Sequence, residues 1–122
     1  MITILGLCIG GVVGVLSRYG LLILSETFGW SSFMMIWMVN LLGVFVLGVV
    51  MALDLESYSS LMKMVIVIGF CGAFTTYSTY IKDFFDLYSQ MSLSMFLFTF
   101  LLYNFLALAI FCLGYKGVLY LK

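Results

Sequence analysis

Four long stretches without a charged side chain constrain this sequence more than any other feature. They cover residues 1–17, 27–53, 64–81 and 87–115. A helix needs about 20 mostly apolar residues to cross the hydrocarbon core of a bilayer, so each stretch can supply one transmembrane helix. The sequence therefore predicts an all-α membrane protein with four transmembrane helices, in a single domain covering residues 1–122.

The remaining composition excludes several classes of function. Only 8% of the residues are charged and five acidic residues balance five basic ones, so no basic surface for nucleic acid is expected. Histidine is absent, which argues against a typical metal cluster and against an enzyme, because a nucleophile would lack a nearby base. The amino-terminal stretch lacks a basic start and a small-residue cleavage site, and we expect it to be retained as the first helix.

The first span, about residues 2–24, carries small residues and a cation on one face. Gly10, Gly14 and Arg18 recur every fourth residue. Small residues at this spacing let two helices approach closely, either within one subunit or between subunits, and the sequence does not choose between these. An arginine at this depth normally faces protein or water. Snorkelling to the surface is the alternative, but its alignment with the glycines favours a buried structural role for Arg18.

The second span, about Phe33–Leu53, holds one strongly polar side chain, Asn40, near its middle. Such an amide can tether two helices, an interaction worth about 1 kcal/mol in membranes. It can equally donate hydrogen bonds into an ion path. The fourth span, about Leu93–Tyr115, is nearly uniform except for Thr99, Tyr103 and Asn104.

The third span contains the segment GFCGAFTTYSTY, Gly69–Tyr80, in which glycines and hydroxyl groups interrupt an apolar helix. The glycines and the Thr75-Thr76 pair are candidates for a break in the helix. A break at membrane depth is tolerated only inside protein or beside a water-filled path. It would free carbonyl groups for a cation and amide groups for an anion.

Beyond the candidate break, Tyr77 and Tyr80 are three residues apart and share a helix face. Aromatic rings have a positive edge, which can stabilise an anion without a full positive charge. Conduction requires such moderate binding, because the ion must also leave. The alternative is that the hydroxyl groups bond to carbonyls of their own helix while the tyrosines pack.

Basic residues near the ends of the spans give a slight orientation signal. Lys63, Lys116 and Lys122 lie on one side of a four-span chain, and Arg18 and Lys82 lie toward the other. Because basic residues prefer the cytoplasm, this distribution favours both termini inside.

Three motifs in order are similar to those of the Fluc (CrcB) fluoride channel family. GFCGAFTTYSTY resembles the third-helix signature of that family, usually GFxGxxTTFSTF. GGVVGVLSRYG, Gly10–Gly20, is similar to its GGxxGxxxRY, and VNLLGVFVLG, Val39–Gly48, resembles its VNxxGxFxxG. Tyr103 matches a tyrosine of the fourth helix, so the resemblance extends over essentially the whole chain.

The resemblance implies a passive fluoride exporter that reduces fluoride toxicity, in the cell inner (plasma) membrane. It implies two four-helix subunits packed antiparallel, with the third helix broken mid-membrane and two pores along the dimer interface. It also implies a structural sodium ion at the centre of the dimer, held by backbone carbonyls at the positions of Gly72 and Thr75.

The resemblance further assigns roles to individual positions. Asn40 matches the pore amide, and Tyr77 and Tyr80 stand where the family has its two pore phenylalanines. The other implied positions are the fourth-helix tyrosine, the polar track of the third helix and the first-helix structural residues: Tyr103, Ser78, Thr79, Arg18, Gly10 and Gly14.

Several family pore positions are altered here. Both phenylalanines are tyrosine, a threonine position holds Ile36, and two serine positions hold Ala107 and Phe111. These changes suggest a second hypothesis, in which the chain is one half of a heterodimer with a paralogous subunit and is weakly active or inactive alone.

Two other functions compete with the channel. A small proton-coupled multidrug exporter would also be a short four-span dimer, but it needs a titratable group at membrane depth. Arg18 is the only charge of the first span, and Glu26 lies at the following loop, so this alternative is weaker. A non-transporting scaffold subunit would explain the altered pore positions.

Overall fold

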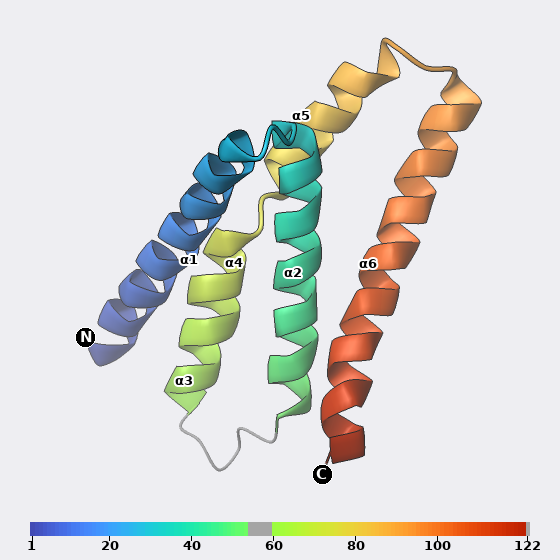
Figure 1. Ribbon diagram of the computed structural model, residues 1–122. Coiled ribbons are helices and arrows are strands. Elements are labelled where there is room, and N and C mark those ends of the chain that lie inside the picture. Colours follow the sequence, from blue (N-terminus) through green and yellow to red (C-terminus); the bar gives the residue numbers. More distant parts are fainter. Residues whose placement is uncertain (54–59, 122) are drawn as a thin grey trace.

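The computed structural model describes residues 1–53 and 60–121, and nearly all of these residues are helical. Three spans are single helices, α1 (Ile2–Thr27), α2 (Ser32–Ala52) and α6 (Leu93–Leu121) (Figure 1). The third span consists of α3 (Ser60–Met64), the π-helical segment η1 (Val65–Cys71), α4 (Gly72–Phe74) and α5 (Tyr77–Tyr88). Four helical stretches of the described residues are long and apolar enough to cross a membrane, which confirms the predicted all-α, four-span architecture at that level.

The turn between α1 and α2 is encoded locally. Gly29 adopts a φ of 69°, a conformation that glycine reaches without steric cost. Its amide donates to the carbonyl of Glu26, and the amide of Trp30 donates to Ser25. The side chain of Ser31 then accepts a hydrogen bond from the amide of Met34 and caps α2.

Helix boundaries differ modestly from those expected. α1 continues to Thr27 and α6 to Leu121, because no glycine turn or proline stops either helix at the point predicted. The polar loop expected over residues 54–63 is shorter, since α3 begins at Ser60, and residues 54–59 lie outside the described part of the chain.

Glycines bring α1 into backbone contact with the third span. A Cβ atom added at Gly10 would lie 2.5 Å from the carbonyl oxygen of Val65, and one at Gly14 would lie 2.5 Å from that of Phe70. Gly69 faces Gly10 from the other side, with its added Cβ 3.2 Å from the Gly10 Cα. Two roles were open for the first-span glycines, packing within one subunit or between subunits. In this structure Gly10 and Gly14 pack against the third span of the same chain.

A second pair of glycines joins α2 to α6. An added Cβ at Gly48 would lie 2.3 Å from the carbonyl oxygen of Phe111, and one at Gly114 would lie 2.6 Å from that of Phe45. The contact is reciprocal, so each helix places its glycine against the backbone of the other. α2 consequently lies between the third span and α6 (Figure 1).

Aromatic side chains hold α5 against α2 and α6. Tyr80, Phe84 and Tyr103 are buried together with Ile36. Trp37 of α2 stacks on Phe84 with ring centroids 5.4 Å apart. Ile36, at a family threonine position, is therefore part of a packed core.

Substituting Gly10 tests the α1 packing. Gly10→Ala should lower the free energy of unfolding by about 1–3 kcal/mol, because the new methyl group meets backbone that cannot move aside easily. Gly11→Ala is the matched control, since nothing lies within 4 Å of a Cβ at that position. The measurement is denaturant unfolding of the purified protein in detergent. Equal stability of the two variants would contradict this packing.

Candidate functional site

The backbone leaves the helix between α4 and α5. Thr75 has φ −79° and ψ 154°, and Thr76 has φ −140° and ψ 85°, both outside the helical region. The hydroxyl of Thr75 donates to the carbonyl of Cys71 at 2.9 Å, which is the back-bonding considered for this segment. Thr76 differs from Thr75, because its amide bonds to a side chain of α2 and its hydroxyl to a side chain of α1.

Asn40 of α2 pairs with the backbone of Thr76 through both ends of its amide. The Asn40 Oδ1 accepts from the Thr76 amide at 2.7 Å, and the Asn40 Nδ2 donates to the Thr76 carbonyl at 3.4 Å. The Thr76 carbonyl also accepts from the amide of Tyr80 at 3.2 Å. Asn40 thus supplies the acceptor that the interrupted helix cannot provide for the Thr76 amide. Of the two roles considered for Asn40, this contact corresponds to the tether between two helices.

Arg18 approaches the same two residues from α1. Its guanidinium donates to the hydroxyl of Thr76 and, at 3.4 Å, to the carbonyl of Thr75. The side chain is half-buried and reaches the interruption because the glycines one and two turns earlier bring α1 close. Three helical spans therefore converge on Thr75 and Thr76.

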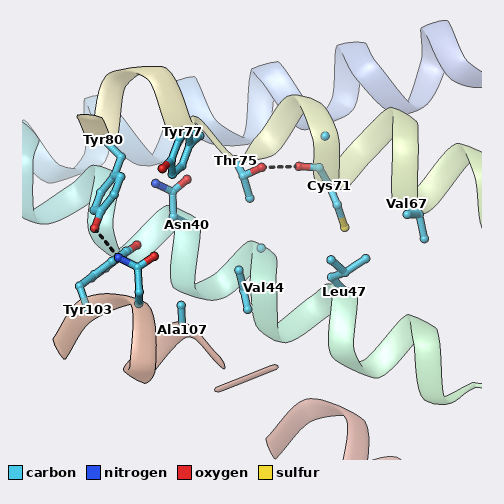
Figure 2. A pocket seen from close by; sticks show the side chains of 13 residues that line it. Asn40, Val44, Leu47, Val67, Cys71, Thr75, Tyr77, Tyr80, Tyr103 and Ala107 are labelled. Atoms are coloured by element: carbon cyan, nitrogen blue, oxygen red, sulfur yellow. Dashed lines mark hydrogen bonds between the residues drawn. The ribbon is translucent and has the colours of Figure 1, made fainter. Parts of the chain in front are cut away.

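A cavity of about 350 Å³ lies beside the interruption, between α2, the third span and α6. Figure 2 shows Tyr77, Tyr80, Tyr103 and Asn40 gathered at one end, with Val67 and Leu47 at the other. None of the described residues that line it is charged; they are Asn40, Gly43, Val44, Leu47, Val67, Cys71, Gly72, Thr75, Tyr77, Tyr80, Tyr103, Asn104 and Ala107. The cavity is thus polar without charge at one end and apolar at the other.

The tyrosines at the polar end have different surroundings. Tyr77 and Tyr80 lie with ring centroids 5.7 Å apart, yet Tyr77 is 67% exposed and Tyr80 only 1%. Tyr103 stacks on Tyr80 at 4.7 Å, and its hydroxyl donates to the carbonyl of Trp37 at 3.2 Å. The shared helix face of Tyr77 and Tyr80 places both rings on the cavity but buries only one.

Asn104 also lines the cavity, although the sequence indicated no role for it. Its Nδ2 donates to the carbonyl of Phe100 at 2.7 Å and to the hydroxyl of Tyr80 at 3.3 Å. Its signal in the sequence was an amide in an otherwise apolar span. That signal did not identify the partner, because Tyr80 lies on another helix.

Other predicted positions lie away from the cavity. Ser78 is exposed and Thr79 half-buried on α5, and neither is among the lining residues. Gly10 and Gly14 face the third span from α1. Of the altered family positions, Ala107 lines the cavity and Phe111 does not.

The interruption offers backbone oxygens as its possible cation ligands. A continuous helix would pair the Gly72 carbonyl with the Thr76 amide, but that amide bonds to Asn40. The Thr75 carbonyl points to Arg18. The described residues contain no group of three His, Cys, Asp or Glu side chains that could hold a metal. Unwound backbone carbonyls are among the ligands that membrane transporters use for sodium, so the donor type at Gly72 and Thr75 fits this ion, with the Thr75 oxygen shared with Arg18.

Replacing Asn40 tests its pairing with Thr76. Asn40→Leu should lower the free energy of unfolding by about 1–3 kcal/mol, because the part-buried Thr76 amide loses its acceptor. Thr27→Val is the control, since the exposed Thr27 hydroxyl bonds to the nearby Leu24 carbonyl of its own helix. Unfolding in detergent measures both variants. A stability of Asn40→Leu equal to that of the control would show that Thr76 finds another partner.

Comparison with known proteins agrees with the motifs. A family model described as CrcB-like protein, Camphor Resistance (CrcB), matches residues 5–115. The chain is similar to a protein of Dehalococcoides mccartyi named fluoride-specific ion channel FluC, with 37% identity over 94 residues, 71% of this chain and 69% of the relative. A protein of the same name from Koribacter versatilis is 32% identical over 108 residues, which are 83% of this chain and 82% of the relative. Another, from Prosthecochloris aestuarii, is 33% identical over 76 residues, which are 61% of this chain and 59% of the relative. With matching motifs in three spans and a match from residue 5 to residue 115, the chain belongs to the CrcB family.

Proposed function

We propose that this multi-pass membrane protein is a fluoride-selective ion channel that lets fluoride leave the cytoplasm passively across the plasma membrane. The observation that carries this proposal is the polar, uncharged end of the cavity formed by Asn40, Tyr77, Tyr80, Tyr103 and Asn104. The name shared by the relatives, fluoride-specific ion channel FluC, supports the same substrate. The chain is accordingly a channel protein and not an enzyme.

The chemistry of the cavity suits a small anion in transit. Hydroxyl and amide donors and the positive edges of aromatic rings can replace part of the hydration shell of fluoride. A cationic side chain in the wall would bind the ion too strongly to release it, and the lining residues that the structure describes include none. Among residues 1–53 and 60–121, those that line the cavity include no carboxylate, which weighs against the proton-coupled exporter.

The working channel in this proposal is an antiparallel dimer with two pores along its interface, and the third span is broken at membrane depth. The exposure of Gly72 and Tyr77 on the third span supports it, because a second subunit packed there would cover uncharged groups beside the cavity. The interruption at Thr75 and Thr76 supports the break. A heterodimer with a paralogous subunit is the second form, suggested by apolar residues at family pore positions such as Ala107.

We also propose a structural sodium ion at the centre of this dimer. The residues that would hold it are Gly72 and Thr75, through their carbonyl oxygens, with the same pair supplied by the second subunit. The Gly72 carbonyl supports this assignment, because its helical partner, the Thr76 amide, is bonded to Asn40 instead. When bound, sodium would supply positive charge that fixes the carbonyls of the two interruptions.

Fluoride efflux from liposomes tests the function directly. The chain alone is reconstituted, an ionophore clamps the counter-ion, and a fluoride electrode follows release while chloride release is followed in parallel. We expect rapid fluoride release with no matching chloride release. Empty liposomes and liposomes with heat-denatured protein provide the controls.

The same assay separates the homodimer from the heterodimer. Absence of release from folded, inserted protein, followed by release once a paralogous family member is reconstituted with it, would favour the heterodimer. If fluoride does not pass in either case, the chain is no channel and the scaffold role stands instead.

Removal of sodium tests the proposed ion. Prolonged dialysis of the reconstituted protein into N-methylglucamine salts should abolish fluoride efflux, and returning sodium should restore it. The organic cation is too large for a site formed by backbone carbonyls. Unchanged efflux after exhaustive removal of sodium would argue against a structural role for the ion.

A further inference from the structure

The Tyr80 hydroxyl accepts its hydrogen bond, whereas the Tyr103 hydroxyl donates one. Asn104 Nδ2 lies 2.7 Å from the Phe100 carbonyl oxygen, which can only accept. This contact fixes the orientation of the amide, with its nitrogen toward Phe100. The same nitrogen lies 3.3 Å from the Tyr80 hydroxyl oxygen, so its second proton is donated there. Figure 2 marks this bond by the dashed line from Tyr80.

Tyr80 therefore uses its oxygen as an acceptor and keeps its own proton for another partner. Among the residues that the structure describes, none accepts that proton. Tyr103 provides the contrast, because its hydroxyl proton is already donated to the Trp37 carbonyl. Tyr77 provides another, because its ring is 67% exposed and is not locked by packing.

Packing fixes the position of the Tyr80 hydroxyl. The ring is 1% exposed and lies between Tyr103 at 4.7 Å and Phe84 at 4.8 Å, measured between ring centroids. A ring held in this way cannot reorient its hydroxyl without disturbing the aromatic cluster. Donation from Asn104 also polarises the hydroxyl, which strengthens the bond that its proton can make.

We propose that Asn104 is a positioning residue that makes Tyr80 a hydrogen-bond donor to the permeating anion. This inference rests on the proposed function, and it deepens it by assigning a donor pair, one member on α5 and one on α6. Phenylalanine, the usual residue of the family signature at position 80, has no hydroxyl to donate. Hydrogen bonds to a charged group are shorter and stronger than neutral ones, so an oriented hydroxyl sets how well fluoride is held.

Efflux kinetics of three variants and a control test the pair. The variants are Tyr80→Phe, Asn104→Leu and the double variant. Thr99→Val is the matched control, because its hydroxyl makes the same type of bond, to the carbonyl four residues earlier on α6, and does not line the cavity. Tyr80→Phe keeps the ring and introduces the residue that is usual in the family signature. It therefore tests the hydroxyl with little effect on the fold.

The fluoride concentration giving half-maximal efflux should rise about tenfold in each single variant, the effect of losing one hydrogen bond to an ion. The double variant should match the single ones, because Asn104 acts only through the Tyr80 hydroxyl. Thr99→Val should behave as the unmodified chain. Effects that add in the double variant, or an unchanged half-maximal concentration in Tyr80→Phe, would overturn the proposal.

An infrared difference spectrum keeps this inference separate from the channel itself. The tyrosine C–O stretch responds to donation by the hydroxyl, so fluoride added in place of chloride to purified protein should shift one band. The shift should vanish in Tyr80→Phe, shrink in Asn104→Leu and persist in Thr99→Val. A shift without efflux would support the donor pair and reject the channel. Efflux without a Tyr80-dependent shift would reject the donor pair and leave the channel.

Discussion

The backbone of Thr76 is the constraint on which the rest of this structure depends. Its amide has left the helical ladder, and an unpaired backbone amide away from water is costly, so it needs another acceptor. Asn40 supplies that partner at 2.7 Å, and Arg18 engages the Thr76 hydroxyl. Both side chains reach across from other spans, so the interruption fixes how α1 and α2 lie against the third span. The close approach of α1 in turn requires the absence of side chains at Gly10 and Gly14.

The cavity beside the interruption follows from the same arrangement. α2 separates the third span from α6, and the reciprocal contact of Gly48 and Gly114 holds α6 on α2. The space between the third span and α6 is closed at one end by the aromatic cluster around Tyr80. Polar groups in that cluster are directed by their partners. The Trp37 carbonyl takes the Tyr103 proton, and Asn104 donates to Tyr80.

Several departures from the family pattern have structural explanations in this chain. Ile36 packs with Tyr80 and Tyr103 in the buried cluster, so the loss of a polar group there is matched by a gain of apolar contact. The backbone carbonyl of Phe111 packs against Gly48 of α2, and the Phe111 ring stacks on Tyr115. The hydroxyl added at position 80 has a donor in Asn104. At each of these positions the side chain present in this chain has a partner in the structure.

The sequence by itself determined the number of spans, because the thickness of a membrane and the spacing of charged residues leave one solution. It also determined which residues share a face, since the helical repeat aligns Gly10, Gly14 and Arg18 and likewise Tyr77 and Tyr80. It marked Gly69–Tyr80 as the segment whose glycines and hydroxyl groups are candidates to interrupt a helix. Periodicity alone, however, fixes a face and not the partner of that face.

Only the tertiary structure decided those partners. Arg18 meets Thr76 across 58 positions of the chain, and Asn104 meets Tyr80 across 24. It also decided that the first-span glycines pack within the chain, and that Tyr80 is buried while Tyr77 is exposed. The physical reason is that such contacts depend on how closely whole helices approach one another. That approach is set by the combined packing of many side chains distant in sequence, so no local pattern encodes it.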